Sequence, residues 1–116
     1  CGVSIFQDLR LLAAQYGFPE GAGVVDLRVP AQRLGFASSG LGLAALCLSV
    51  LGVPLSKPQA VRCSRWDAAR LSTAQVRYAA CDAAVAPAIL AGMHRRCGAG
   101  AGLQQWSRQF VGVRRV

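Results

Sequence analysis

Apolar positions recur at helical spacing along much of the chain, and short apolar runs between them carry strand signals. The first helix is expected over positions 5–16, where one apolar face repeats every three or four residues through Ile5, Leu9, Leu12 and Tyr16. Ser4 and Gln7 fit a capping box that opens this helix, and Gly17 is expected to close it. Asp8 falls in its first turn, where an acid complements the helix dipole.

Two short segments carry strand signals. Residues 1–3 resemble the end of a strand, and residues 24–27 are typical of a short buried strand after a turn at 21–23. Pro30 suits the first turn of a short helix that runs to about Gly35. This alternation predicts an α/β architecture, but such a sheet needs several strands. We therefore expect the fold to be truncated at the N-terminus, with its first strands missing.

The most apolar stretch lies at 41–53, within a segment that carries no charge between Arg33 and Lys57. At 1.5 Å per residue its thirteen residues would span about 20 Å, which is short of the roughly 30 Å of a bilayer core. We therefore predict a buried helix over 41–51 that ends at Gly52, and no membrane span.

A basic loop at 56–67 leads into the longest predicted helix, over 74–96. Thr73 is expected to cap this helix, and Pro87 is its one expected kink. The many alanines of the segment favour helix formation.

Residues 98–116 form a separate segment, which begins with a flexible linker of glycine and alanine. Its second half carries apolar residues at helical spacing between arginines, which fits a docking helix or a frayed tail: Leu103, Trp106, Phe110 and Val113. The chain is therefore divided into residues 1–97 and a linker with a basic amphipathic tail.

Composition adds a strongly basic character to this picture. With 116 residues the chain is about one small domain, and 53% hydrophobic residues exclude a disordered tail. The net charge is +8, and twelve of the thirteen basic residues are arginines, whose guanidinium groups suit phosphates or carboxylates. GC-rich coding DNA gives the same excess of arginine. Charge alone therefore leaves a nucleic-acid partner and a compositional bias as open alternatives.

The cysteines do not form a recognisable framework. They stand at positions 1, 47, 63, 81 and 97 without a CxxC pair, and His94 is the one histidine. This pattern indicates neither a zinc site nor a disulfide framework, so a reducing compartment is the simpler assumption. The chain opens on Cys1 without a methionine or a signal segment, and we expect it to be a fragment.

Tyr78 and Asp82 are the most informative pair for chemistry. Four residues apart on a helix, they share one face, and small alanines surround them. Such a face can pack closely on a sheet or leave room for a ligand. A tyrosine and an aspartate at this spacing are structural more often than functional, so the pair needs its wider context.

That context resembles a known family. Residues 62–67, followed by Leu71, Gln75 and the block 78–83, are similar to the last motif block of the 3′-5′ exonuclease domain found in Werner-type exonucleases and ribonuclease D. Earlier segments resemble the second motif and the intervening strand and helix of that domain: Gly2-Val3 with Asp8, Val25-Asp26-Leu27 and Gly42-Leu43-Ala44-Ala45-Leu46. The resemblance covers residues 1–96 and leaves the tail unmatched.

The resemblance implies a ribonuclease H-like fold and an active site of the DEDD type with a tyrosine. In such a site, acidic side chains hold two divalent ions, Mg²⁺ or Mn²⁺, at a 3′ end of nucleic acid. By position in the motifs, Asp82 would ligate the ion that activates water, Tyr78 would orient that water, and Asp8 would support the second ion. Two ions in this arrangement also stabilise the leaving oxygen of a phosphodiester.

The family's first motif, an Asp and a Glu two residues apart on the first strand, does not occur in this sequence. The acids present are Asp8, Glu20, Asp26, Asp67 and Asp82. Two carboxylates supply too little negative charge and too few ligands for two dications. We therefore expect the chain as written to be inactive.

The sequence thus predicts the C-terminal portion of a 3′-5′ exonuclease domain that removes nucleoside monophosphates from single-stranded 3′ ends of DNA or RNA. Two alternatives stay open. One is a non-catalytic module of the same fold that binds nucleic acid or a protein, and the other is an incomplete gene product without a stable fold.

The basic loop carries three candidates for nucleic-acid contact. Trp66 fits stacking on a base, as aromatic rings among arginines do in single-strand binding, or anchoring of the loop to the core. Arg62 and Arg65 fit phosphate contacts or solvated charges. His94 near a helix end and Cys81, expected as a small packed side chain, are assigned no chemistry.

Overall fold

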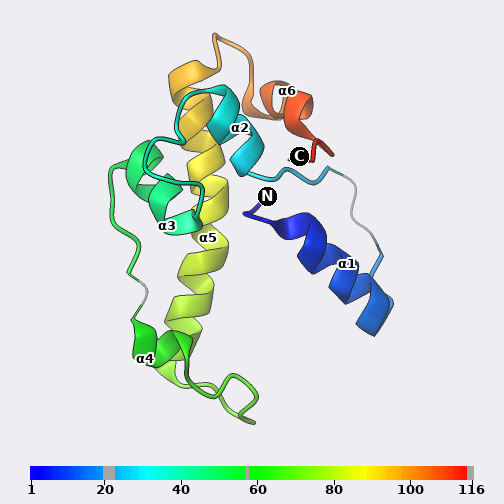
Figure 1. Ribbon diagram of the computed structural model, residues 1–116, viewed down its shortest axis with the longest axis vertical. Helices are drawn as coiled ribbons and strands as arrows, with labels where there is room; N and C mark the ends of the chain where they lie inside the picture. The colour runs from blue at the N-terminus through cyan, green and yellow to red at the C-terminus, as the bar shows by residue number, and fades with distance from the viewer. Residues whose placement is uncertain (20–22, 57, 115–116) are drawn as a thin grey trace.

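Helices dominate the structure, a computed structural model that describes residues 1–19, 23–56 and 58–114 (Figure 1). Their bounds in chain order are α1 Ile5–Tyr16, α2 Arg28–Arg33, α3 Leu43–Leu46, the π-helical turn η1 Cys47–Leu51, α4 Gln59–Arg62, α5 Thr73–Cys97, α6 Leu103–Ser107 and the 3₁₀ turn η2 Arg108–Phe110. The turn expected at 21–23 lies largely outside the described residues.

Extended pairing is limited to one point in the described part of the chain. Gly2 and Asp26 form an isolated parallel bridge, in which the Gly2 N–H donates to the Val25 carbonyl at 3.2 Å and the Leu27 N–H donates to the Gly2 carbonyl at 2.8 Å. The strands expected at 1–3 and 24–27 therefore meet, but they are too short to build a sheet. The predicted α/β class is not confirmed by these residues.

Helix α5 forms the long axis of the molecule (Figure 1). Its C-terminal half buries Ile89 and Met93 completely in the hydrophobic core, which η1 also enters through Val50. Gly92 permits this close packing, because a Cβ atom at that position would lie 2.8 Å from Cγ1 of Val50. The core is therefore built against the second half of α5 and leaves the first half free to line a site.

The C-terminal segment is docked rather than frayed. Trp106 and Phe110 are buried, with ring centroids 5.2 Å apart, and the His94 ring lies 5.3 Å from the Trp106 ring. The Gly112 N–H donates to the Val24 carbonyl at 2.8 Å. Of the two possibilities that the sequence leaves open for this segment, the structure adopts the docking helix, α6.

Helix α1 stands apart from that core (Figure 1). None of its residues is buried, and Leu12 and Tyr16 of its predicted apolar face are exposed. The helix ends at Gly17, as predicted, where φ is 63°. The predicted capping box at its start is wrong, because Ser4 adopts a left-handed conformation with φ of 56° and its side chain makes no capping hydrogen bond.

The predicted apolar helix at 41–51 is present in two parts, α3 and η1, and it ends at Gly52 with φ of 69°, as expected. Helix α5 is the one helix of the described chain that is long and apolar enough to cross a membrane by length and composition. This property is weak evidence for a span, because core helices of soluble proteins share it.

A buried ion pair fixes the segment that pairs with the N-terminus. Asp26 is 1% exposed, and its carboxylate accepts hydrogen bonds from the Arg28 backbone N–H at 3.0 Å, from Nε at 3.1 Å and from Nη2 at 2.8 Å. Burial acts to raise the pKa of Asp26. The hydrogen bonds and charge of Arg28 outweigh burial, so the pKa of Asp26 lies below its usual value.

Asp26→Asn is expected to lower the free energy of unfolding by about 3 kcal/mol at pH 7, because it leaves Arg28 beside a buried neutral amide. The pKa of Asp26 is lower in the folded than in the unfolded chain, so its stabilising effect is complete above about pH 4 and is lost as the pH falls through the lowered value. Denaturation curves of both proteins should therefore converge in acid.

The matched control is Asp67→Asn, since the Asp67 side chain is 81% exposed and pairs only loosely with Arg65 at 3.6 Å. This control should unfold like the parent chain at every pH. Equal stability of Asp26→Asn and the parent at pH 7 would contradict a stabilising role for the buried pair.

Candidate functional site

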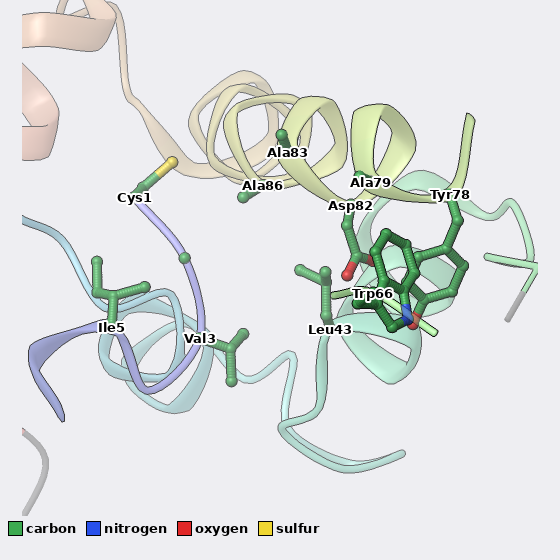
Figure 2. A pocket seen from close by; sticks show the side chains of 11 residues that line it. Cys1, Val3, Ile5, Leu43, Trp66, Tyr78, Ala79, Asp82, Ala83 and Ala86 are labelled. Carbon is green, nitrogen blue, oxygen red and sulfur yellow. The ribbon is translucent and has the colours of Figure 1, made fainter. Parts of the chain in front are cut away.

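A pocket of about 740 Å³ lies where the N-terminal segment, α3 and the first half of α5 come together. Figure 2 shows its lining, which is mostly small or apolar: Cys1, Gly2, Val3, Ile5, Leu43, Trp66, Tyr78, Ala79, Asp82, Ala83 and Ala86. The alanines of α5 leave the space open, because larger side chains on this face would fill it. One carboxylate, that of Asp82, faces this space.

The structure brings Tyr78 and Asp82 together, as the sequence predicts. They lie one turn apart on α5, both are half-buried, and both side chains line the pocket (Figure 2). The phenol hydroxyl can donate and accept a hydrogen bond, and the carboxylate can accept several or ligate a cation. The pair therefore offers polar chemistry at one end of an apolar cavity.

Trp66 joins this pair from the loop that precedes α5. Its ring centroid lies 5.8 Å from that of Tyr78 at an interplanar angle of 53°, and its Nε1–H donates to the Arg62 carbonyl at 3.1 Å. The residue is still 37% exposed. Trp66 is thus held at the pocket, and part of its surface stays exposed.

The start of α5 sets the position of this pair. Ser72 caps the helix, since its Oγ accepts the Gln75 N–H at 3.1 Å while Oε1 of Gln75 accepts the Ser72 N–H at 2.8 Å. The expected cap at Thr73 is therefore displaced by one residue. The reciprocal capping box explains the choice, because Gln75 is three residues after Ser72 and satisfies the cap backbone.

Other predicted site residues lie outside the pocket. Asp8 is exposed in the first turn of α1 and is not among the lining residues. Arg62 and Arg65 are exposed as well, and the Arg65 side chain, 84% exposed, pairs at 3.6 Å with Asp67. The structure therefore gathers Trp66, Tyr78 and Asp82 and leaves Asp8 and the two arginines elsewhere.

Sequence reasoning missed part of the pocket and its support. Leu43 and Val3 line it, although neither was predicted as a site residue. Gln75 is buried, at 6% exposure. In the sequence it stands out only as part of the block that resembles the family motif, which predicts neither its burial nor its contacts. A polar residue three positions after a serine at a helix start was the available signal for its capping role.

The donor set does not fit two divalent ions. Among the described residues, no group of three or more His, Cys, Asp or Glu side chains is placed to hold a metal ion. Mg²⁺ requires about six oxygen ligands in near-octahedral geometry, and the pocket offers the Asp82 carboxylate with the Tyr78 hydroxyl beside it. These residues supply at most part of one metal site.

Comparison with known proteins decides the family. A family model described as "3'-5' exonuclease" matches residues 1–96. The chain belongs to the 3′-5′ exonuclease family. This membership confirms the resemblance carried by the block from residue 62 to residue 83, and nuclease activity is the activity of the family in general.

Two curated members of the 3′-5′ exonuclease family, both named "Exonuclease 3'-5' domain-containing protein 2", are similar to the chain over 90 residues. The mouse protein is 39% identical and the human protein 41%, and each match covers 76% of this chain and 14% of the relative. The chain therefore spans a small part of the curated relatives that it matches.

Crystal structures of the exonuclease domain of exonuclease 3′-5′ domain-containing protein 2 (EXD2) are also similar to this chain. A crystal structure of the EXD2 exonuclease domain soaked in Mn and GMP matches 99% of this chain and 55% of the solved chain, with 32% identity and a TM-score of 0.51. A second crystal, soaked in Mn and Mg, matches 79% of this chain and 46% of the solved chain at 37% identity, with a TM-score of 0.46. This chain thus covers about half of a solved exonuclease domain.

The position of the helix start is testable with two substitutions. Ser72→Ala is expected to cost about 1 kcal/mol of unfolding free energy, because the Gln75 N–H loses its acceptor. Thr73→Ala should leave stability within about 0.5 kcal/mol of the parent, because Thr73 is an exposed first-turn residue. Thermal denaturation of the two variants side by side measures this, and a larger loss for Thr73→Ala would contradict the assignment.

Proposed function

We propose that this chain is the nucleotide-binding part of a 3′-5′ exonuclease domain that hydrolyses the terminal phosphodiester at single-stranded 3′ ends of DNA or RNA. The observation that carries the proposal is the convergence of Trp66, Tyr78 and Asp82 on one pocket in a chain of this family. Its volume, about 740 Å³, suits a ligand the size of a nucleoside monophosphate. The EXD2 domain soaked in Mn and GMP supports this class of ligand.

Each of the three side chains has a role that its chemistry fits. The partly exposed Trp66 ring offers a face on which the terminal base can stack. The Tyr78 hydroxyl can hold a water molecule near the terminal phosphate. The Asp82 carboxylate is a hard oxygen ligand, suited to Mg²⁺ or Mn²⁺, and a bound divalent ion would supply activation of water.

Three further residues, which lie outside the pocket, carry proposed roles. Arg62 and Arg65 are exposed on the loop that carries Trp66, where contacts to phosphates further along the strand fit their charge. Asp8 lies in the segment that resembles the second motif of the family, and from that place in the motif it is proposed to support a second ion.

Binding without hydrolysis is the expected behaviour of the chain by itself. The pocket holds one carboxylate from the described residues, which is too few to retain two divalent ions. A non-catalytic module that binds nucleic acid is therefore the second candidate function. The single carboxylate of the pocket favours this candidate, and so does the net charge of +8, which attracts nucleic-acid phosphates.

Asp82→Asn tests the site directly. The substitution keeps the size of the side chain but removes the charge that a divalent ion needs, so the affinity for GMP in the presence of Mn²⁺ should fall about tenfold. In EDTA this advantage of the parent should disappear, and Asp82→Asn should bind GMP at least as tightly, because a carboxylate without its ion repels the phosphate. Isothermal titration calorimetry of both proteins measures this difference, with the exposed Asp67→Asn as the matched control of charge.

The same proteins distinguish the candidate functions. Equal GMP affinity of Asp82→Asn and the parent in Mn²⁺ would contradict the assignment of Asp82. Release of mononucleotides from a labelled single strand that Asp82→Asn abolishes would place catalysis in this chain and overturn its expected inactivity. Binding of the strand that weakens steeply with salt and yields no product would favour the non-catalytic module.

A further inference from the structure

Gln75 is a buried polar side chain to which the proposed function gives no role. It lies one turn before Tyr78 on α5 and is 6% exposed. Both ends of its amide are in use: Oε1 accepts the Ser72 N–H at 2.8 Å, while Nε2 donates to Ser64 Oγ at 2.9 Å and to the Arg65 carbonyl at 3.0 Å. One buried side chain thus joins the helix start to the preceding loop.

The loop that Gln75 reaches is the one that carries Trp66. The Arg65 carbonyl immediately precedes Trp66, so the hydrogen bond from Gln75 fixes the backbone at the base of that side chain. The loop also has two internal hydrogen bonds: Ser64 Oγ donates to the Val61 carbonyl, and Trp66 Nε1 donates to the Arg62 carbonyl. Gln75 therefore ties a locally bonded unit, residues 61–66, to the helix that carries Tyr78.

Trp66 needs this support to stay at the pocket. Its contact with Tyr78 is a tilted ring pair at 5.8 Å, and more than a third of the residue faces solvent. The neighbouring side chains of Arg65 and Asp67 are more than 80% exposed and add no burial. An amide suits the position, since it accepts at one end and donates twice at the other, whereas a carboxylate only accepts.

We propose that Gln75 is the positioning residue that holds Trp66 against Tyr78 at the mouth of the pocket, and that it thereby sets the affinity of the site for the terminal base. The first half of this statement concerns the structure alone. The second half rests on the proposed function, in which Trp66 stacks on that base. The two halves are measured separately below.

Gln75→Glu is the sharpest test. The variant keeps the length of the side chain and the acceptor for the Ser72 N–H, but it loses both hydrogen bonds donated to the loop. In NMR spectra, the nuclear Overhauser effect between the Trp66 and Tyr78 rings should be lost. The indole N–H signal of Trp66 should shift toward its free value, while that of the buried Trp106 stays unchanged and reports an intact core.

GMP affinity is the second readout. Gln75→Glu should weaken GMP binding on the order of tenfold, as Trp66→Ala should, because both remove one stacking contact. The double variant should bind no more weakly than Trp66→Ala alone, because Gln75 acts through Trp66. Gln15→Glu on the exposed surface of α1 adds the same charge away from the site and should change neither readout.

Ser64→Ala provides an independent variant in case Gln75→Glu does not fold. It removes one of the two acceptors on the loop and leaves the capping box intact, so a smaller change in the same direction is expected. A retained Trp66–Tyr78 contact in Gln75→Glu, or further weakening in the double variant, would overturn the inference. Loss of that contact with unchanged GMP affinity would support the positioning role and overturn the stacking role of Trp66 in the proposed function.

Discussion

The structure depends on one long helix, α5, whose two halves lie in different surroundings. The second half of α5 is fixed in the core by Ile89, Gly92 and Met93, and its first half carries Tyr78 and Asp82 into the pocket. Along an α-helix each residue rises by 1.5 Å and turns by 100°, so the spacing between two of its residues fixes their relative positions. The separation and common direction of the two site residues are therefore set by backbone hydrogen bonds and not by the loops around them.

The rest of the pocket is attached to this helix from two sides. On one side, the capping box between Ser72 and Gln75 and the tether to the Arg65 carbonyl hold the loop that carries Trp66. On the other side, the bridge between Gly2 and Asp26 places the N-terminal segment opposite α5, and the ion pair with Arg28 fixes Asp26. The buried polar groups at both attachments thus have hydrogen-bond partners, which offset the free-energy cost of removing these groups from water.

Sequence reasoning succeeded where local chemistry decides the outcome. Gly17 and Gly52 end their helices because glycine adopts positive φ without strain, and Tyr78 and Asp82 share a face because of their spacing. It failed at Ser4, whose left-handed backbone depends on the chain around it. It also could not place Asp8, because the position of α1 relative to α5 follows from tertiary packing and not from the residues of α1. The α/β class rested on short strand signals, and these residues form only one bridge.

The central claim is that the terminal nucleotide lies in the pocket that Trp66, Tyr78 and Asp82 line. Its most direct test is photocrosslinking of a single strand that carries 5-iodouracil at its 3′ end, with tryptic mapping of the product. The account predicts crosslinks in the peptides 66–70 and 78–95, and none when the label is moved ten nucleotides inward. Crosslinks from the 3′ end that map instead to α6 and the tail, or that are independent of label position, would contradict it.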